Sequence, residues 1–298
     1  MRRPATKIIV AAFALGALIV GVAGARLSLR EAPCADGFTR IGARCCASKT
    51  RAVAGVPRCE ISPKAPCPAP LEETSRGCDV PEVMVAIPAT KVVIGPSDWE
   101  AEGRVPPRTV ETKAFAIDRF EVTVGRACAS STFRGAKLCA WDDSPRSFSG
   151  ASLREARAFC KERGARLPTE DEWLAAAAGD KPRRYPWGDT GAVCRRAAWG
   201  LKNGPCGNGA DGPDTAGAHP DGATPLGVHD LAGNVAEWVE TGACPDEADP
   251  KKPCVAIVRG GSWETALATE LRTWLRREVP ADSHDATIGF RCARDAVP

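Results

Sequence analysis

The chain has 298 residues and a formal net charge of +3, with 29 glycines, 25 prolines and 14 cysteines. This length accommodates one large domain with an accessory segment, and the near-neutral charge argues against nucleic acid as a partner. The high content of glycine and proline predicts a fold that is rich in turns.

The first 25 residues have the features of an export signal. Basic residues precede an uncharged run of eighteen residues, 8–25, which ends in Ala23-Gly24-Ala25. This pattern is typical of a signal peptide that is cleaved, here after Ala25. An apolar run of this length is also long enough to stay in place as a membrane anchor. The sequence leaves these two alternatives open.

The even number of cysteines favours disulfide bonds. An oxidising compartment would explain so many cysteines, so we expect an extracytoplasmic protein that is periplasmic, at the cell surface or secreted. Buried free thiols are the alternative. No Cys-x-x-Cys sequence occurs, which argues against a zinc knuckle and against a thioredoxin-like redox pair.

Residues 26–80 hold six of the cysteines in a segment that is too short to build a core of its own. We interpret this segment as a small disulfide-stapled module or stalk. The sequence does not choose among its possible pairings, which involve Cys34, Cys45, Cys46, Cys59, Cys67 and Cys78. The main domain is predicted to occupy residues 81–298.

Three segments of the main domain are predicted to contain strands, at residues 83–88, 92–95 and 115–123. The first two are short runs rich in β-branched residues, with proline or glycine at their ends. The third is a longer run of the same kind. Further along the chain, Ser152 and Glu155 form an S-x-x-E capping box, and Gly164 supplies a stop signal. A helix is therefore expected between them, with Leu153, Ala156 and Cys160 on one buried face.

A second helix is predicted to begin after Thr169, with Glu172 completing a capping box, and to end before Gly179. Its expected buried stripe is Trp173, Ala176 and Ala177. Residues 188–225 then contain many glycines, aspartates, asparagines and prolines. A loop this long in a compact domain is usually functional or held by cross-links, so disulfides are expected to hold it.

A series of short motifs follows in order along the main domain. It begins with Ile87-Pro88-Ala89, Ile117-Asp118-Arg119-Phe120-Glu121-Val122-Thr123 and Arg166-Leu167-Pro168-Thr169-Glu170-Asp171-Glu172-Trp173. It continues with Tyr185-Pro186-Trp187-Gly188, Gly233-Asn234-Val235-Ala236-Glu237-Trp238, Arg259-Gly260-Gly261-Ser262-Trp263 and Gly289-Phe290-Arg291-Cys292. Together these motifs, which span residues 83–294, resemble the sulfatase-modifying-factor family, whose founding activity is formylglycine generation.

The resemblance implies an α+β fold, a formylglycine-generating-enzyme-like variant of the C-type-lectin-like fold that is loop-rich and stapled by disulfides. It also implies a bridge between Cys160 and Cys292. The remaining cysteines of the domain fall into close couples, which we expect to pair: Cys128 with Cys139, Cys194 with Cys206, and Cys244 with Cys254.

The best-known reaction of this family uses a copper(I) ion held by two thiolates, since soft sulfur ligands suit that metal. The resemblance places the two thiols shortly after Trp263, at the positions of Thr265 and Glu270. A shift of register by two or three residues gives Ala268 or Thr273, which also lack sulfur. Copper is therefore not expected, and no catalytic residue is predicted.

Calcium is the other metal that the resemblance suggests. Relatives hold calcium near the G-N-x-x-E-W motif, so Asn234 and Glu237 are candidate ligands. The alternative is that both side chains satisfy buried backbone groups. A second calcium position in relatives corresponds to Ala197-Ala198-Trp199, which lacks the side-chain ligand. In the long loop, turn formation is the favoured role of Asn208, Asp211 and Asp214.

The three histidines, His219, His229 and His284, are far apart in the sequence, which argues against an iron or zinc enzyme built on them. The stretch that lines the cleft of active relatives carries several polar and aromatic residues. The candidate cleft residues are Glu264, Thr265, Glu270, Arg272, Trp274 and Arg276, with Arg277 beside them. Guanidinium groups and a tryptophan face could bind a peptide, a protein or a saccharide. The alternative for each arginine is a surface ion pair. Trp99, Trp141 and Trp199 are expected in the core, although any of them could line a groove.

The leading hypothesis is an exported family member that lacks the thiol pair and serves as a non-catalytic binding or scaffolding module. The first alternative is a divergent metal-dependent oxidase of the same superfamily. The second is a formylglycine-generating enzyme that works through displaced cysteines.

Overall fold

The computed structural model describes residues 38–41, 44–47, 50–53, 56–61, 67–74, 77–95, 106–136, 139, 144–244 and 254–296, the first four segments by their backbone alone. The expected export signal, Cys34, Trp99 and Trp141 lie outside these residues. The side chains of Cys45, Cys46 and Cys59 lie outside them too. No helix in the described part of the chain is long and apolar enough to cross a membrane.

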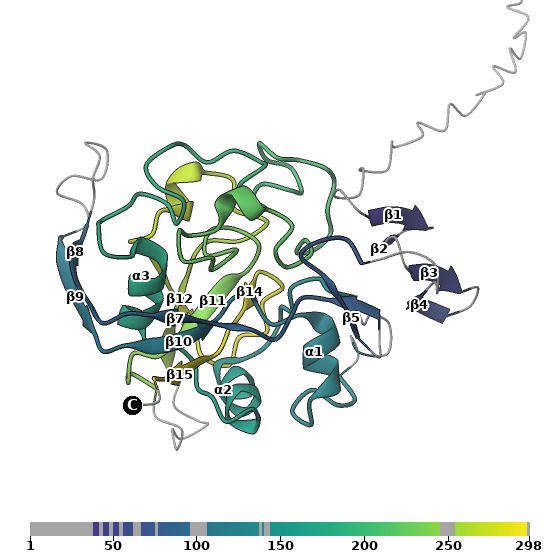
Figure 1. Ribbon diagram of the computed structural model, residues 1–298, viewed down its shortest axis with the longest axis horizontal. Helices are drawn as coiled ribbons and strands as arrows, with labels where there is room; N and C mark the ends of the chain where they lie inside the picture. The colour runs from purple at the N-terminus through teal and green to yellow at the C-terminus, as the bar shows by residue number, and fades with distance from the viewer. Residues whose placement is uncertain are drawn as a thin grey trace, which may run out of the picture. The chain divides into compact units, whose positions relative to one another are not determined.

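Short strands and few helices make up the described chain (Figure 1). The strands up to the first helix are β1 (Phe38–Ile41), β2 (Arg44–Ala47), β3 (Thr50–Val53), β4 (Val56–Ile61), β5 (Glu72–Thr74), β6 (Gly77–Asp79), β7 (Met84–Ile87), β8 (Thr90–Ile94), β9 (Arg108–Thr112) and β10 (Phe115–Asp118). The later strands are β11 (Ala236–Val239), β12 (Val255–Arg259), β13 (Arg276–Pro280), β14 (Ile288–Gly289) and β15 (Ala293–Asp295). The helices are α1 (Val124–Ala129), α2 (Leu153–Glu162) and α3 (Glu170–Ala178), with 3-10 turns η2 (Pro220–Gly222) and η3 (Ala268–Leu271).

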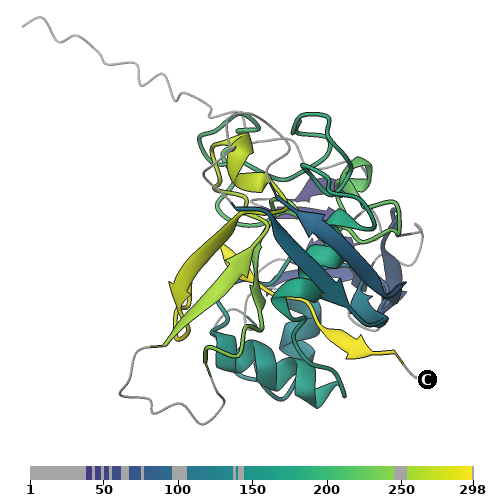
Figure 2. The same ribbon diagram turned by 90° about the vertical axis from the view of Figure 1, so that its left-hand side faces the viewer.

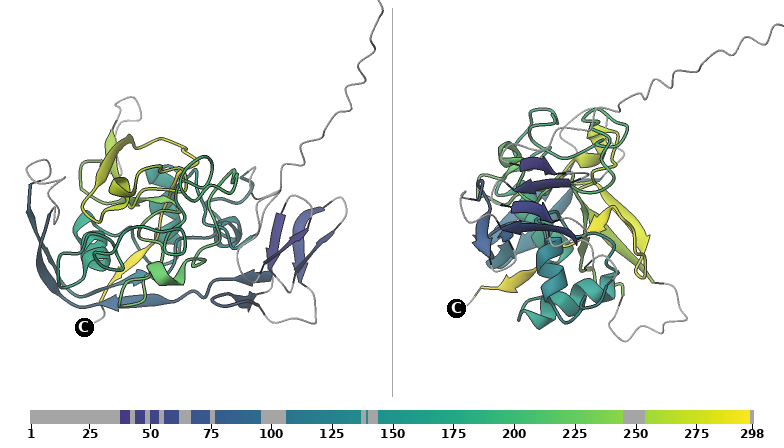
Figure 3. Two further views of the ribbon diagram at one scale, coloured as in Figure 1. Left: turned by 90° about the horizontal axis from the view of Figure 1, so that it is seen from above. Right: turned by 90° about the vertical axis from the view of Figure 1, so that its right-hand side faces the viewer.

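Two sheets organise the main domain. One has the order β15-β10-β7 and is antiparallel throughout. The other has the order β13-β12-β11-β14, in which β11 pairs antiparallel with β12 and parallel with β14. The strands β8 and β9 form a separate hairpin, which runs along one flank of the domain in Figure 3. Such short and mixed pairings explain why the sequence shows so little long-range periodicity.

Both faces of the four-stranded sheet are buried at β11 and along most of β12, whereas the outer strand β13 is mostly exposed. On β11, Ala236 and Trp238 pack into one apolar cluster, whereas Val239 packs into the other, as the alternation of side chains along a strand requires. The first cluster joins the sheet to α1 and α2 and includes the contacting rings Phe159 and Phe290, whose centroids lie 5.3 Å apart. The second cluster joins the sheet to α3 and to the smaller sheet.

The two predicted helices are confirmed at both ends. In α2, Ser152 and Glu155 form the capping box, and Gly164 follows the helix with a φ of +64°. In α3, Thr169 forms the box with Glu172. Gly179 ends that helix with a φ of +70°, a backbone angle that glycine adopts without steric cost. The residues expected to be buried, which include Cys160 and Trp173, are at most 2% exposed.

The predicted strands are found with changed bounds, and one is shorter than expected. β7 and β8 lie within one or two residues of their predicted ranges. The strand predicted at 115–123 ends at Asp118. The chain turns inward there, because the backbone N–H of Val122 donates to the carbonyl of Phe290 at 3.0 Å. Thr123, the last residue of the predicted strand, is instead the N-cap of the short helix α1.

The long loop is irregular, as predicted, and η2 is its one helical turn within residues 188–225. The Cys194–Cys206 bridge closes part of it. The carbonyl of Leu201 accepts hydrogen bonds from the backbone N–H groups of Asn208, Gly209 and Ala210. Together with η3, this loop occupies the end of the domain opposite α1 and α2 (Figures 1 and 2).

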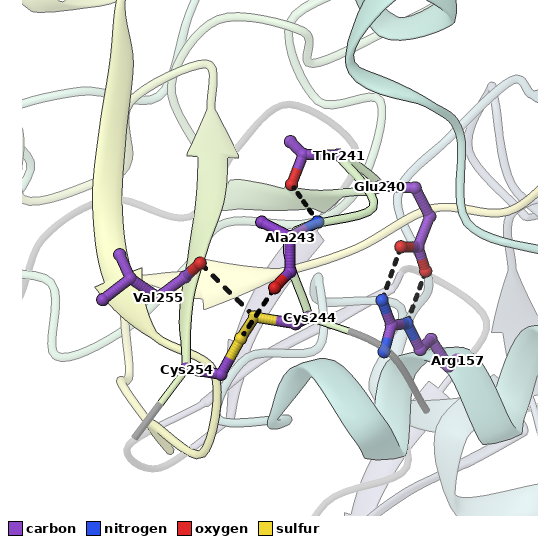
Figure 4. The surroundings of a disulfide bond; sticks show 7 residues. All are labelled: Arg157, Glu240, Thr241, Ala243, Cys244, Cys254 and Val255. Carbon is purple, nitrogen blue, oxygen red and sulfur yellow. Dashed lines mark hydrogen bonds and ion pairs between the residues drawn. A yellow bond between two sulfur atoms is a disulfide. The ribbon is translucent and has the colours of Figure 1, made fainter. Parts of the chain in front are cut away.

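Five disulfide bonds join the ten cysteines whose side chains the structure describes, and none of these ten is free. Cys160 pairs with Cys292, as the resemblance implied, and joins α2 to the segment before β15. The three expected close couples also pair, and Cys67 pairs with Cys78. Figure 4 shows the Cys244–Cys254 bridge at the end of the β11–β12 hairpin, where Glu240 pairs with Arg157 of α2.

Candidate functional site

A pocket of about 340 Å³ lies where β12 ends in the Arg259-Gly260-Gly261-Ser262 segment. Its wall also includes the start of β13 and three further residues from the stretch between these strands, Thr265, Glu270 and Leu275. The polar and charged side chains that line it are Arg259, Ser262, Thr265, Glu270, Arg276 and Arg277. This position makes it the structural counterpart of the cleft that the sequence predicted.

A tight turn places Thr265 at the pocket. Its Oγ1 accepts a hydrogen bond from the backbone N–H of Ser262 at 2.9 Å, and its own N–H donates to the carbonyl of Ser262 at 3.0 Å. Gly261 has a φ of +72°, and a Cβ atom there would lie 2.8 Å from a methyl carbon of Leu271. Only glycine allows the turn to approach η3 so closely. Glu270, which belongs to η3, is thereby brought to the same pocket.

Arg259 fixes the opposite wall. Its Nη1 donates to the carbonyls of Thr273, Trp274 and Leu275, at 3.1 to 3.4 Å. Its Nη2 pairs with Glu170 at the start of α3. Burial lowers the pKa of Arg259 to about 10, against the opposing effect of Glu170, so the guanidinium stays charged at neutral pH. This buried cation therefore holds the segment before β13 against β12.

Only some of the predicted cleft residues reach this pocket. Thr265, Glu270 and Arg276 line it, together with Arg277. Glu264 points to solvent instead and pairs with Lys202 at 3.2 Å. Trp274 is 5% exposed and belongs to the core, with the guanidinium of the buried Arg272 at 5.8 Å from its ring centroid. All four residues of the segment 271–274 are buried, and both side chains therefore lie in the interior.

A larger groove of about 690 Å³ lies beside the N-terminus of α3. Six carboxylates line it, and each already has a basic side chain as an ion-pair partner. The paired carboxylates are Glu111, Glu170, Asp171, Glu172, Glu240 and Asp295. The smaller pocket is therefore the better candidate for a binding site.

The two candidate calcium ligands are engaged with protein groups. The carboxylate of Glu237 accepts hydrogen bonds from Nε and Nη2 of Arg291, at 2.8 and 2.7 Å, and from the indole N–H of Trp173 at 2.9 Å. Asn234 accepts from the backbone N–H of Asp214 at 2.8 Å and donates to Glu121 at 2.6 Å. Calcium needs six to eight oxygen ligands. This donor set does not fit the ion, since its oxygens already accept protein hydrogen bonds.

Glu121 lies at the centre of this buried network. Its carboxyl group interacts with Ser147, Asn234 and the backbone N–H of Val235. Burial raises the pKa of Glu121 well above its ordinary value, and the nearby carboxylates of Asp230 and Glu237 raise it further. Asn234 and Asp230 also adopt left-handed backbone angles, with φ of +56° and +59°. Such backbone strain persists only where the surrounding contacts hold it in place.

The Glu121→Gln substitution is expected to make the free energy of unfolding fall less steeply as the pH rises. The folded protein holds the Glu121 proton more tightly than the unfolded chain does, because its folded pKa is raised. Its contribution to stability is therefore complete below the ordinary glutamate pKa and is lost as pH rises through the folded pKa. The effect amounts to at most about 1.4 kcal/mol per pH unit. Urea unfolding between about pH 5 and about pH 8 measures it.

The control for this experiment is Glu264→Gln, which changes an exposed carboxylate away from the network. Its profile is expected to run parallel to that of the unsubstituted protein. If the profile of the Glu121→Gln variant also ran parallel, Glu121 would titrate alike in the folded and unfolded chain, and the buried network described above would be wrong.

The three histidines occupy unrelated positions. His219 lies 3.3 Å from Asp214, His229 stacks on Phe120 with ring centroids 4.7 Å apart, and His284 lies 2.9 Å from Glu155 at the surface. Within the described residues, no three His, Cys, Asp or Glu side chains group as metal ligands. Asn208 and Asp214 each accept a hydrogen bond from a backbone N–H one or two residues further on, as turn-forming residues do.

Comparison with known proteins addresses the family directly. The chain matches the model described as "Sulfatase-modifying factor enzyme 1-like domain" over residues 71–296. The protein belongs to the sulfatase-modifying-factor family. The match begins at the β5–β6 hairpin, which packs through Leu71 and Cys78 against Phe120 and Ala216 of the main domain.

Two curated relatives in this family have the name "Inactive C-alpha-formylglycine-generating enzyme 2". The protein of Bos taurus is 37% identical over 154 residues, which are 49% of this chain and 49% of that relative. The protein of Mus musculus is 30% identical over 273 residues, 72% of this chain and 86% of that relative. The chain therefore spans about half the length of the bovine relative and most of the murine one.

A solved structure shows the same fold. PvdO from Pseudomonas aeruginosa superimposes with a TM-score of 0.56 at 22% identity, over 78% of this chain and 100% of that one. The expected fold class is confirmed: the protein has the loop-rich α+β fold of formylglycine-generating enzymes, a variant of the C-type-lectin-like architecture.

The family relationship also shows which signals the sequence analysis left unused. Glu121, Arg259 and Arg291 each belong to a motif that carried the resemblance, but the sequence alone assigned no role to them. In the structure they are the three charged residues that organise the buried network and the pocket wall. Each of these charged residues stands inside a family motif next to apolar residues. That pattern could have indicated that the charge is buried and has a structural role.

At the positions that the resemblance gives for the family's thiols, the pocket presents a hydroxyl and a carboxylate. Thr265 and Glu270 are hard oxygen donors, which do not suit copper(I). Every cysteine whose side chain the structure describes is in a disulfide, and no cysteine lies between Cys254 and Cys292. The residues of the pocket therefore do not fit the copper ion of active relatives.

Proposed function

We propose that this protein is an exported, non-catalytic member of the family that binds a peptide segment of a partner in the pocket at Gly260-Gly261-Ser262. The observation that carries the proposal is the pair Thr265 and Glu270, which stand where the resemblance places two thiols. The names of the bovine and murine relatives agree with a loss of catalysis. Binding by a lectin-like scaffold is an argument from fold, and it supplies the role that remains.

Export is the second part of the proposal. Five disulfides in the described chain are typical of an oxidising compartment. The basic residues and apolar run at the N-terminus are those of a signal peptide or an anchor. Both observations support a periplasmic, cell-surface or secreted protein.

Incubation with a Cys-x-Pro-x-Arg peptide, copper and oxygen tests the loss of catalysis. The peptide is expected to keep its mass, because the pocket has no thiolate pair to hold copper(I). Mass spectrometry of the peptide is the measurement, and an active formylglycine-generating enzyme is the positive control. Conversion of the cysteine to an aldehyde would show that displaced cysteines or another site supply the activity, and the proposal would fail.

A further inference from the structure

The pocket at Gly260-Gly261-Ser262 carries an excess of positive charge. Three arginines, Arg259, Arg276 and Arg277, line it together with the single acidic residue Glu270. Arg259 is already paired with Glu170 of α3, so the excess comes from Arg276 and Arg277. In the larger groove beside α3, by contrast, every carboxylate has a basic partner. The excess charge therefore belongs to this pocket and is not a general property of the surface, since the whole chain has a net charge of only +3.

The ion pairs that Arg276 and Arg277 make within the protein are weak. Arg276 Nε lies 3.3 Å from an oxygen of Glu170, and the same oxygen also pairs with Arg259. The other contact of Arg276, to Glu278, is 3.9 Å. Arg277 lies 4.0 Å from Asp285. Arg277 Nη2 also donates to Thr287 Oγ1 at 3.3 Å. The side chains of Arg276 and Arg277 are 47% and 52% exposed, and ion pairs of such exposed groups contribute little to stability, so both guanidiniums are available to an incoming anion.

Among the groups that an unmodified peptide presents, a carboxylate is the anion that suits these arginines. A guanidinium group binds a carboxylate through two parallel hydrogen bonds. Arg276 and Arg277 are the first residues of β13, an outer strand of the four-stranded sheet. An extended peptide that passes along this edge would carry its side chains to the pocket.

We propose that the pocket selects peptides that present a carboxylate, and that Arg276 and Arg277 determine this selectivity. The inference rests on the proposed function, because it names the class of ligand that the binding module takes. Glu270 acts in the opposite direction, since its negative charge in the same pocket opposes an acidic ligand.

A positional-scanning library of hexapeptides, acetylated and amidated, tests the inference on the full disulfide-bonded chain. The protein is immobilised and the retained peptides are quantified by mass spectrometry. Pools with a fixed Asp or Glu are expected to be enriched about tenfold over the matching Asn or Gln pools. A parallel library of neutral peptides with a free C-terminus distinguishes a side-chain carboxylate from a terminal one.

Two variants assign the selectivity to residues. The double variant Arg276→Gln/Arg277→Gln is expected to lose the enrichment. The control Arg195→Gln/Arg294→Gln removes two exposed arginines that do not line the pocket, and it is expected to keep the enrichment. The Glu270→Gln variant is expected to bind acidic pools more tightly, by roughly threefold. A merely structural role of these side chains would not produce a gain.

The possible outcomes separate the inference from the proposed function. Retention of neutral and acidic pools alike would overturn the acidic selectivity and leave peptide binding intact. Retention of no pool would overturn both. If the control double variant also lost the enrichment, the effect of charge would be nonspecific. If the Glu270→Gln variant bound acidic peptides more weakly, the pocket would not be the site that selects them. Both results would overturn the inference.

Discussion

The Arg291→Met substitution is expected to lower the free energy of unfolding by about 3–5 kcal/mol, since it leaves a buried carboxylate without its partner. The side chains of Arg291 and Glu237 are 0% and 1% exposed and form a two-pronged pair. Arg291 also donates to the carbonyls of Asp118, Arg119 and His229. A loss of this size is a large part of the stability of a typical domain. Urea unfolding at neutral pH is the measurement.

The double variant Glu237→Gln/Arg291→Met is the matched control. It removes both charges, so it is expected to recover part of the stability that the single variant loses, because no unpaired charge remains buried. The three carbonyls still lose their donor, and the recovery is therefore incomplete. A single variant within about 1 kcal/mol of the original protein would show that Glu237 can be neutralised in place, contrary to the pairing described here.

Removal of the Cys160–Cys292 bridge is expected to cost about 5 kcal/mol, the largest effect among the disulfides that the structure describes. The bridge joins residues 132 positions apart, and a longer closed loop restricts the unfolded chain more strongly. Both cysteines are fully buried, so the Cys160→Ser/Cys292→Ser variant also places two hydroxyl groups in an apolar cluster. Thermal or urea unfolding without reductant checks the loss.

The comparison variant is Cys128→Ser/Cys139→Ser, which opens a bridge of separation 11. Its expected cost is about 3 kcal/mol in the same chain-entropy model. Equal losses for the two pairs would contradict the entropic argument and would point to native-state contacts as the source of the stability.

Local signals predicted α2 and α3 well, because their caps depend on residues that are three positions apart in the sequence. Ser152 with Glu155, and Thr169 with Glu172, need no tertiary contact to specify a helix start. The strand at residues 115–123 was predicted too long for the opposite reason. Its end is set by a hydrogen bond from Val122 to Phe290, and such a distant contact leaves no mark on the local pattern.

The pocket contains only some of the residues that the sequence predicted for a cleft. The order of the family motifs led to Thr265 and Glu270, and both line the pocket. Arg272 and Trp274 were expected in the cleft and instead lie in the interior. The sequence could not indicate this, because the segment that carries them has no regular alternation of polar and apolar residues. Arg259 was missed because its role depends on carbonyl groups 14 to 16 residues away.

The hydrogen bonds of Arg259 have a consequence for ligand recognition. Three carbonyls of the segment that leads into the pocket wall are already satisfied, and Arg259 ties this segment to α3 through Glu170, whether or not a ligand is present. A preorganised wall of this kind needs little ordering at the moment of association, so binding loses little conformational entropy. Affinity in such a site is set by how well the ligand matches a fixed shape and charge, which suits a module that recognises one short feature of a partner.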